Sequence, residues 1–140
     1  MHLLVDGYTH DSDLLKDARK ISTLLDEIPG MIKMTKISKP VVTEYTDGAR
    51  VMDWGLSGFV LIAESHISIH TFPERNYVNV DVFSCKEFDY IASAETIAGV
   101  FGLREYELTL LQRGLEYLNE ADDNLDIERK RFYVPGHGER

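Results

Sequence analysis

Residues 58–69 have the sequence GFVLIAESHISI, which is the densest strand signal in the chain, and Pro73 ends the strand. A continuous apolar run follows the glycine, and isoleucines then alternate with polar residues, a pattern typical of a buried strand. Because successive strand side chains point to opposite faces, we expect His66, Ser68 and His70 on one side of the sheet. Ser65 and the isoleucines should lie on the other side, unless the chain bends at Glu64–Ser65.

The flanking segments predict an α+β fold. Helical spacing of apolar residues predicts one helix that is capped at Asp11 or Ser12 and ends near Pro29-Gly30. A second helix is expected over residues 90–100. Strands are expected over residues 2–8, 31–37, 41–45, 77–85 and 105–111, with a turn at residues 46–48.

Pro73 and residues 74–76 form a turn signal, so residues 58–69 and 77–85 are expected to form a hairpin at the centre of a mostly antiparallel sheet. Helices on one face of that sheet make a two-layer α+β sandwich. No remaining segment is large enough to cover the other face, so we expect a second subunit to do so. Residues 116–131 are crowded with charge and predict a peripheral helix and a loose tail. We therefore expect one domain over residues 1–114 and a charged extension over residues 115–140.

The composition restricts the classes of partner and compartment. A net charge of −9 and a pI near 4.9 argue against nucleic-acid binding, which needs clustered Lys and Arg. Cys85 is the one cysteine, so no internal disulfide can form. The first residues lack the pattern of a signal peptide, and no apolar run is long enough to cross a bilayer. These features predict a cytoplasmic protein without a membrane partner.

Two interpretations of the reactive side chains follow from the residues alone. His66 and His70 could suggest a metal site, but four residues of strand separate two imidazoles by roughly 13 Å, too far for one zinc ion. We therefore expect no metal. A cysteine hydrolase that pairs Cys85 with His70 stays open, although no helix begins at the cysteine to lower the pKa of its thiol.

The run SGFVLIAESHISIHTFPE at residues 57–74, together with VDVFSC at residues 80–85, closely resembles the prokaryotic S-adenosylmethionine decarboxylase proenzymes. Residues 2–6 and 105–114 match more weakly, so the resemblance covers most of residues 1–114. It implies a chain that cuts itself between Glu64 and Ser65 and converts Ser65 into a pyruvoyl group. That carbonyl would form a Schiff base with a substrate amine and act as an electron sink. The products would be residues 1–64 (the β chain) and residues 65–140 (the α chain).

The resemblance also assigns roles to individual residues. Ser57 would support the oxyanion during cleavage, His70 would remove the α-proton of Ser65, and Cys85 would return a proton to the α-carbon after CO2 leaves. Glu74 would hold the ribose hydroxyls of S-adenosylmethionine, and Phe72 would lie beside its adenine. The family implies a homodimer whose sites draw residues from both subunits, and a product that is used in spermidine and polyamine synthesis.

One segment departs from the family pattern. Where many relatives carry a phenylalanine six residues before the serine of the Ser-Gly pair, this chain has Val51, and residues 39–53 look longer than usual. Trp54 could supply that wall of the adenine slot. A smaller pocket would instead suit arginine or ornithine, so a pyruvoyl-dependent decarboxylase of either amino acid is the alternative. An uncleaved relative that only binds a ligand or a partner subunit is a third hypothesis.

Overall fold

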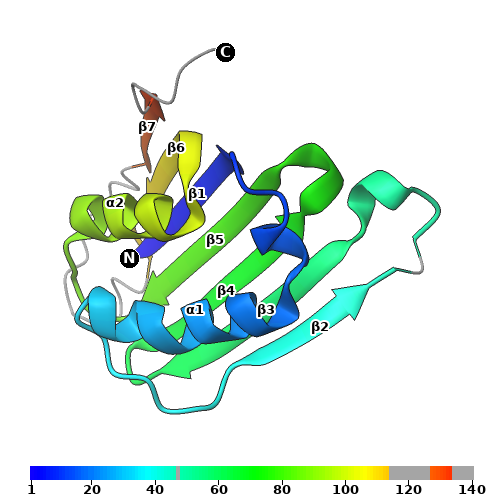
Figure 1. Cartoon of the computed structure of the whole chain (residues 1–140). Coiled ribbons are helices and arrows are strands. Elements are labelled where there is room, and N and C mark those ends of the chain that lie inside the picture. Colours follow the sequence, from blue (N-terminus) through cyan, green and yellow to red (C-terminus); the bar gives the residue numbers. More distant parts are fainter. Residues whose placement is uncertain (47, 114–126, 134–140) are drawn as a thin grey trace.

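The computed structural model describes residues 1–46, 48–113 and 127–133, and within them seven strands form one sheet with two helices (Figure 1). The strands are β1 (His2–Thr9), β2 (Val41–Tyr45), β3 (Gly55–Ile62), β4 (Ser65–Phe72), β5 (Tyr77–Ser84), β6 (Leu103–Leu111) and β7 (Ile127–Tyr133). The helices are α1 (Ala18–Met31) and α2 (Tyr90–Phe101), with short 3₁₀ turns η1 (Leu14–Lys16), η2 (Val51–Asp53) and η3 (Pro73–Arg75).

The strand order is β2-β3-β4-β5-β1-β6-β7, and every neighbouring pair is antiparallel. Figure 1 shows both helices on the same face of this sheet. The predicted α+β sandwich, with the β4–β5 hairpin in the middle of the sheet, is confirmed. No helix covers the second face in the part of the chain that the structure describes, and we call this second face the open face.

The dense strand signal divides into two strands. The chain turns at Ala63-Glu64, so β3 and β4 pair from Ser57 opposite His70 to Ile62 opposite Ser65. Along β4, Ile67 and Ile69 are fully buried beneath the helices, while the alternate residues point to the open face. The turn thus lies one residue before the possible bend at Glu64–Ser65, and Ser65 is the first residue of β4.

The first helix begins later than its sequence predicts. Asp17 is the N-cap of α1, because its carboxylate accepts the backbone N–H groups of Arg19 and Lys20, each at 3.1 Å. Asp17 itself is extended, which separates α1 from η1. At the other end, Pro29 lies inside the last turn of α1, where a proline removes only one helical hydrogen bond.

Two further predictions are wrong. Residues 31–37 form no strand: Lys33 adopts a left-handed conformation with φ of 61°, and only an isolated bridge joins Lys36 to Ile62. Instead of a helix at the end of residues 116–131, Ile127–Tyr133 forms β7, which pairs with β6. Phe132 stacks on Tyr106 with ring centroids 5.2 Å apart. Asp47, residues 114–126 and residues 134–140 lie outside the described residues.

Thr71 connects three elements beneath the helices. Its side-chain oxygen accepts the backbone N–H of Leu56 at 2.9 Å and donates to the carbonyl oxygen of Leu15 at 2.8 Å. The residue is 2% exposed, so both partners are sealed from water. This one hydroxyl therefore links the end of β4 to β3 and to η1.

Thr71→Val should lower the free energy of unfolding by about 2–4 kcal/mol, because a buried N–H and a buried carbonyl lose their partner at almost constant volume. Thr96→Val is the control, since the Thr96 hydroxyl donates to Ala92 at an exposed site in α2, and the change there should stay within about 0.5 kcal/mol. Urea unfolding of both variants measures the difference. Equal losses in the two variants would contradict the role of Thr71.

Candidate active site

The predicted cleavage point lies at the bend between β3 and β4. Here the backbone N–H of Cys85 donates to the carbonyl oxygen of Glu64 at 2.9 Å. The register of β4 and β5, which pairs Ser65 with Ser84, brings these residues together. The carbonyl on the N-terminal side of the predicted cut is thus already polarised by a backbone donor.

The hydroxyl of Ser65 lies next to an imidazole. Its Oγ is 3.3 Å from Nδ1 of His66, and Ser65 itself is half-buried. The free thiol of Cys85 belongs to the same end of the sheet and is also partly exposed. The sequence analysis gave His66 no role, although its position directly after the serine was a signal that could have found this contact.

A ring of aromatic and charged side chains adjoins this end of the open face. The imidazoles of His66 and His2 each lie 5.6 Å from the ring of Phe83, and the guanidinium of Arg113 lies 4.1 Å above that ring. His2 Nε2 is 3.4 Å from a carboxylate oxygen of Asp81. Burial lowers the pKa of His2, and the Asp81 carboxylate offsets only part of that effect. The neutral form of His2 is therefore favoured in the folded chain.

Ser57 and His70 face each other across β3 and β4, as their shared register requires. Ser57 Oγ lies 2.9 Å from His70 Nδ1, a hydrogen bond whose donor depends on the tautomer of the imidazole. His70 is exposed on the open face. The structure thus joins the hydroxyl and the imidazole that the sequence analysis assigned to processing.

The two groups of side chains are far apart within one chain. Five residues of β4 separate Ser65 from His70, which corresponds to roughly 16 Å along the strand. The two side chains also leave the strand on opposite faces, because they are an odd number of positions apart. His70 of a chain therefore cannot reach the α-carbon of Ser65 in the same chain.

The same geometry excludes the cysteine hydrolase hypothesis within one chain. His70 pairs with Asn79 on β5, whereas Cys85 lies six residues further along the chain, roughly 20 Å at strand spacing. Among the described residues, no group of three or more His, Cys, Asp or Glu side chains is arranged to hold a metal ion. In the same part of the chain, no helix combines the length and apolar character that a membrane crossing requires.

Three residues are predicted to bind substrate, namely Trp54, Phe72 and Glu74. Only two of them line the same cavity. Trp54 and Glu74 line a cavity of about 260 Å³, and Glu74 lies 3.8 Å from the ammonium group of Lys16. Phe72 does not line this cavity. Its ring packs against the ring of Tyr77, with the two ring centroids 6.1 Å apart. Side-chain alternation places Phe72 on the open face, whereas the cavity also involves residues of η1.

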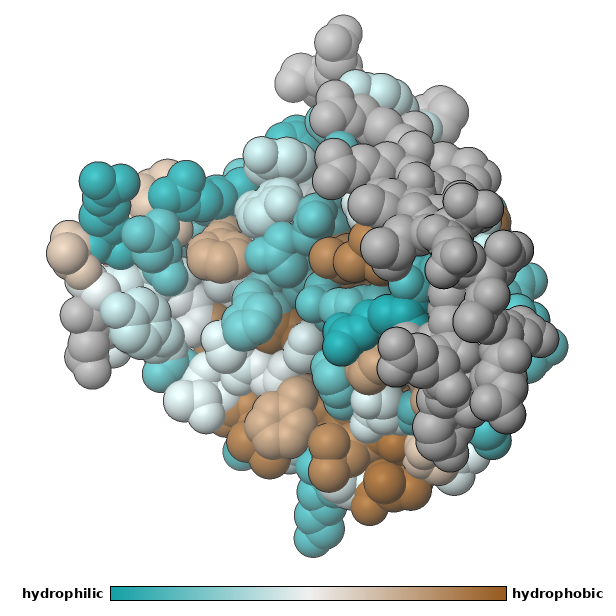
Figure 2. Space-filling model, turned by 180° about the vertical axis from the view of Figure 1, so that it is seen from behind, coloured by the Kyte–Doolittle hydropathy of each residue, from teal (hydrophilic) through white to brown (hydrophobic). Residues whose placement is uncertain are grey.

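The open face has an apolar edge and a polar middle (Figure 2). Val41, Phe59 and Leu61 form the edge patch on β2 and β3, and they are 47%, 43% and 43% exposed. Toward the middle, Asn79 donates to the carboxylate of Asp6 at 2.5 Å, and burial raises the pKa of that carboxyl group. A single chain therefore leaves large apolar side chains in water beside a polar, partly buried sheet surface.

Comparisons with known proteins agree on one family. A family model described as S-adenosylmethionine decarboxylase matches residues 1–114. The S-adenosylmethionine decarboxylase proenzyme of Geobacillus kaustophilus (strain HTA426) is 44% identical over 61 residues, which are 44% of this chain and 49% of the relative. The proenzyme of Archaeoglobus fulgidus is 29% identical over 114 residues, which are 81% of this chain and 96% of the relative. The chain thus spans about half the length of the Geobacillus relatives that it matches.

One solved structure shares the fold. The crystal structure of the adenosylmethionine decarboxylase from Aquifex aeolicus VF5 aligns with a TM-score of 0.61 and covers 99% of this chain and 94% of that chain. The two sequences are 23% identical, so this likeness concerns the fold alone.

The depressed pKa of His2 predicts a pH-dependent loss of stability. The unfolded chain binds the His2 proton more readily than the folded chain, so stability falls as the pH decreases through about 6.5. His2→Gln removes this titration. We expect the free energy of unfolding to fall more steeply from pH 7 to pH 5 in the unmodified protein than in the variant, as measured by urea unfolding at each pH. Parallel curves would contradict the partly buried, neutral His2.

Proposed function

The chain belongs to the S-adenosylmethionine decarboxylase family, and on that premise we propose that it is a self-cleaving proenzyme that cuts between Glu64 and Ser65 and decarboxylates S-adenosylmethionine. The observation that carries the proposal is the hydrogen bond from the N–H of Cys85 to the carbonyl oxygen of Glu64 at 2.9 Å. Cleavage converts Ser65 into a pyruvoyl group at the start of a new chain over residues 65–140. The product would supply the aminopropyl group for spermidine synthesis.

The bend supplies the parts that the first step of cleavage needs. Ser65 Oγ attacks the carbonyl carbon of Glu64, and the bond from that carbon to the Ser65 nitrogen breaks to give an ester. The N–H of Cys85 stabilises the negative charge that develops on the Glu64 oxygen. His66 Nδ1, at 3.3 Å from the hydroxyl, is placed to take its proton, and the proton ends on the released amine.

The second step needs a base at the α-carbon of Ser65, and His70 of the same chain cannot reach that carbon. Removal of the Ser65 α-proton breaks the ester, releases the Glu64 carboxylate and leaves a dehydroalanine. Hydrolysis of that residue releases ammonia and leaves the pyruvoyl group. His70, which is hydrogen-bonded to Ser57, is the base that the family implies, yet it lies roughly 16 Å along β4 from Ser65. We therefore propose that His70 of the partner subunit acts on Ser65.

Pairing of two open faces in a homodimer would satisfy this requirement. A two-fold axis that lies between the two open faces, perpendicular to β4, brings the Ser65 end of one β4 toward the His70 end of the other, because the two strands then run in opposite directions. The exposed Val41, Phe59 and Leu61 support such pairing, since a partner would remove them from water. Each site would combine Ser65 and Cys85 of one chain with Ser57 and His70 of its partner.

The mature site would hold a cationic amino acid derivative. When formed, the pyruvoyl carbonyl supplies the electron sink for loss of CO2. The Cys85 thiol lies at the Ser65 end, where it can return a proton to the substrate α-carbon. The Glu74 carboxylate can accept hydrogen bonds from ribose hydroxyls, and the Trp54 ring in the same cavity offers a wall for the adenine. Phe72, on the open face, would contact the ligand only where that face meets a partner.

Ser65→Ala should give a folded chain of full length, because no hydroxyl remains to attack the Glu64 carbonyl. Intact-mass spectrometry of the unmodified protein should instead give fragments 1–64 and 65–140, with a pyruvoyl group on the second. Cys85→Ala is the control: it keeps the backbone N–H, so it should still cleave while its release of CO2 falls by roughly 10²-fold, the scale of a lost proton donor. Cleavage of Ser65→Ala at this bond would refute the assigned site.

The two-chain site predicts complementation between inactive variants. Ser65→Ala and His70→Ala, carrying different affinity tags, should each remain uncut when expressed alone. In the mixed dimer, the His70→Ala chain keeps Ser65 and receives His70 from its partner, so this chain alone should be cut. Mass spectrometry of the doubly purified dimer identifies which chain is cleaved.

An uncut mixed dimer would contradict the sharing of the site. The substrate is tested separately, by CO2 release from S-adenosylmethionine, arginine and ornithine in parallel. Turnover of arginine or ornithine alone would favour the alternative decarboxylase, and a pure, uncut chain without turnover would favour a binding protein.

A further inference from the structure

Residues 48–54, which connect β2 to β3, are held mainly by polar contacts. Within the segment, the indole N–H of Trp54 donates to the carbonyl oxygen of Gly48 at 3.3 Å. Two further hydrogen bonds come from Arg75, which lies outside the segment. Arg75 Nε donates to the carbonyl oxygen of Met52 at 3.2 Å, and Arg75 Nη2 donates to the carboxylate of Asp53 at 2.8 Å. One guanidinium therefore holds the middle of the segment at two points.

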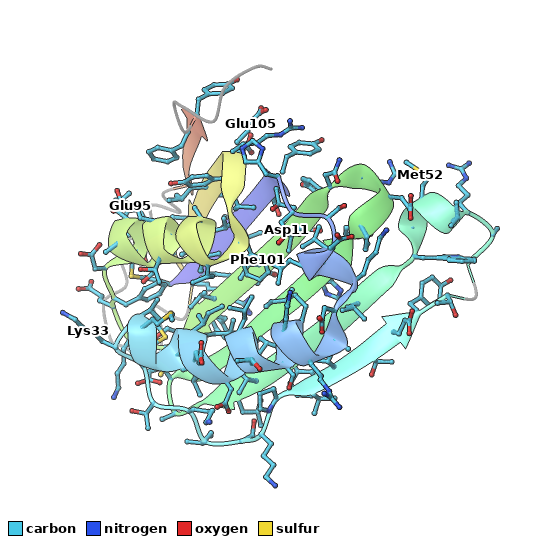
Figure 3. The ribbon with its side chains drawn as sticks, viewed as in Figure 1. Asp11, Lys33, Met52, Glu95, Phe101 and Glu105 are labelled. Carbon is cyan, nitrogen blue, oxygen red and sulfur yellow. The ribbon has the colours of Figure 1, made fainter. Side chains whose placement is uncertain are left out.

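Apolar burial contributes little to this placement. The apolar side chains Val51, Met52 and Trp54 are 50%, 40% and 37% exposed. Figure 3 shows Met52 at the periphery of the molecule, close to the turn between β4 and β5. Because few apolar contacts hold the segment, its position depends on the two Arg75 hydrogen bonds and on the strand that follows it.

Arg75 projects from a rigid part of the fold. Pro73 begins η3 and is buried, and Asn76 ends the turn in a left-handed conformation with φ of 53°. The carbonyl oxygen of Asn76 accepts the N–H of Thr9 at 2.8 Å, which joins the turn to β1. The planar guanidinium presents donors in fixed directions, so it can fix both a carbonyl and a carboxylate. A lysine ammonium could not reproduce this fork.

The two segments that Arg75 joins both line one cavity. Val51 and Trp54 line it from the β2–β3 segment, and Pro73 and Glu74 line it from η3. Arg75 and Asp53 are not among the residues that line it. The separation between the Trp54 ring and the Glu74 carboxylate is therefore set by contacts that do not touch the cavity.

We propose that Arg75 is a positioning residue that holds residues 48–54, and with them Trp54, at a fixed distance from Glu74. The bonds to Met52 and Asp53 form a latch outside the lining of the cavity. Its effect on substrate binding rests on the proposed function, in which Trp54 and Glu74 contact the nucleoside part of the substrate. The latch itself is a property of the folded chain and can be measured without any substrate.

The fluorescence of Trp54 reports on the latch directly, because it is the one tryptophan in the sequence. Arg75→Ala should raise the acrylamide quenching constant by about two-fold, since the segment opens and exposes more of the indole. Arg75→Lys should give a similar rise, because the fork is lost while the charge stays, and Asp53→Asn should give a smaller one. Circular dichroism at the same temperature checks that each variant is folded.

The chain offers a matched control for these variants. Lys36 and Asp26 form another exposed ion pair that does not involve residues 48–54. Lys36→Ala and Asp26→Asn remove the same kinds of charge, and they should leave the quenching of Trp54 unchanged. Quenching in folded Arg75→Ala equal to that of the unmodified protein, or an equal rise in the controls, would overturn the proposal.

Kinetics separate a positioning role from general damage to the fold. In Arg75→Ala, we expect KM for S-adenosylmethionine to rise by about ten-fold while kcat and the extent of self-cleavage change less than about two-fold, because the Arg75 side chain bonds to Met52 and Asp53 and to none of the residues assigned to cleavage. Increased quenching with an unchanged KM would overturn the assignment of the latch to substrate binding. Absence of turnover in the unmodified protein would contradict the proposed function, while the quenching comparison would still decide whether the latch exists.

Discussion

The alternation of side chains along β4 is the constraint on which the other features depend. Ile67, Ile69 and Thr71 turn toward the helices and are buried, so the residues between them must face the other way. A shift of one residue in register would place two isoleucines in water and three polar side chains in the core. The buried hydroxyl of Thr71, bonded to both β3 and η1, holds the end of the strand in that register. The same packing that stabilises the sheet therefore presents His66 and His70 on the open face.

This constraint also divides the reactive groups. The carbonyl of Glu64 meets the N–H of Cys85 at one end of β4, and the hydroxyl of Ser57 meets the imidazole of His70 near the other. Neither pair can move toward the other without breaking the strand pairing of β3, β4 and β5. A flexible loop could bring distant residues together, but a central strand cannot. The division is the physical reason why a second chain enters the proposed mechanism, and it agrees with the exposed apolar patch on β2 and β3.

Several of these features could be predicted from the sequence, because they depend on local patterns. Alternation predicted which face of β4 carries His70, and the turn signal after Pro73 predicted the central hairpin. Features that depend on tertiary contacts were missed. The left-handed conformation of Lys33 interrupts the strand that was expected over residues 31–37. The many charged residues of β7 did not suggest a strand, although in the structure Phe132 stacks on Tyr106. The motif identified Ser57, Ser65, His70 and Cys85 as one set, but a linear motif contains no distances and could not separate them into two groups.

The proposed substrate-binding end follows a different physical rule from the proposed cleavage end. At the bend, strand register fixes the positions of the Glu64 carbonyl and the Cys85 N–H, so few changes in the length of this segment are compatible with the fold. Residues 48–54 lie at the edge of the sheet, and hydrogen bonds to Arg75 fix their place more than burial does. Such a segment can change in length and composition without disturbing the core, because it contributes little buried apolar surface. This explains how a valine can stand at position 51 where the resemblance leads one to expect an aromatic ring, while Trp54, three residues later, lines the same cavity. Under the proposed function, substrate preference can therefore vary at this edge while the chemistry of the bend stays constant.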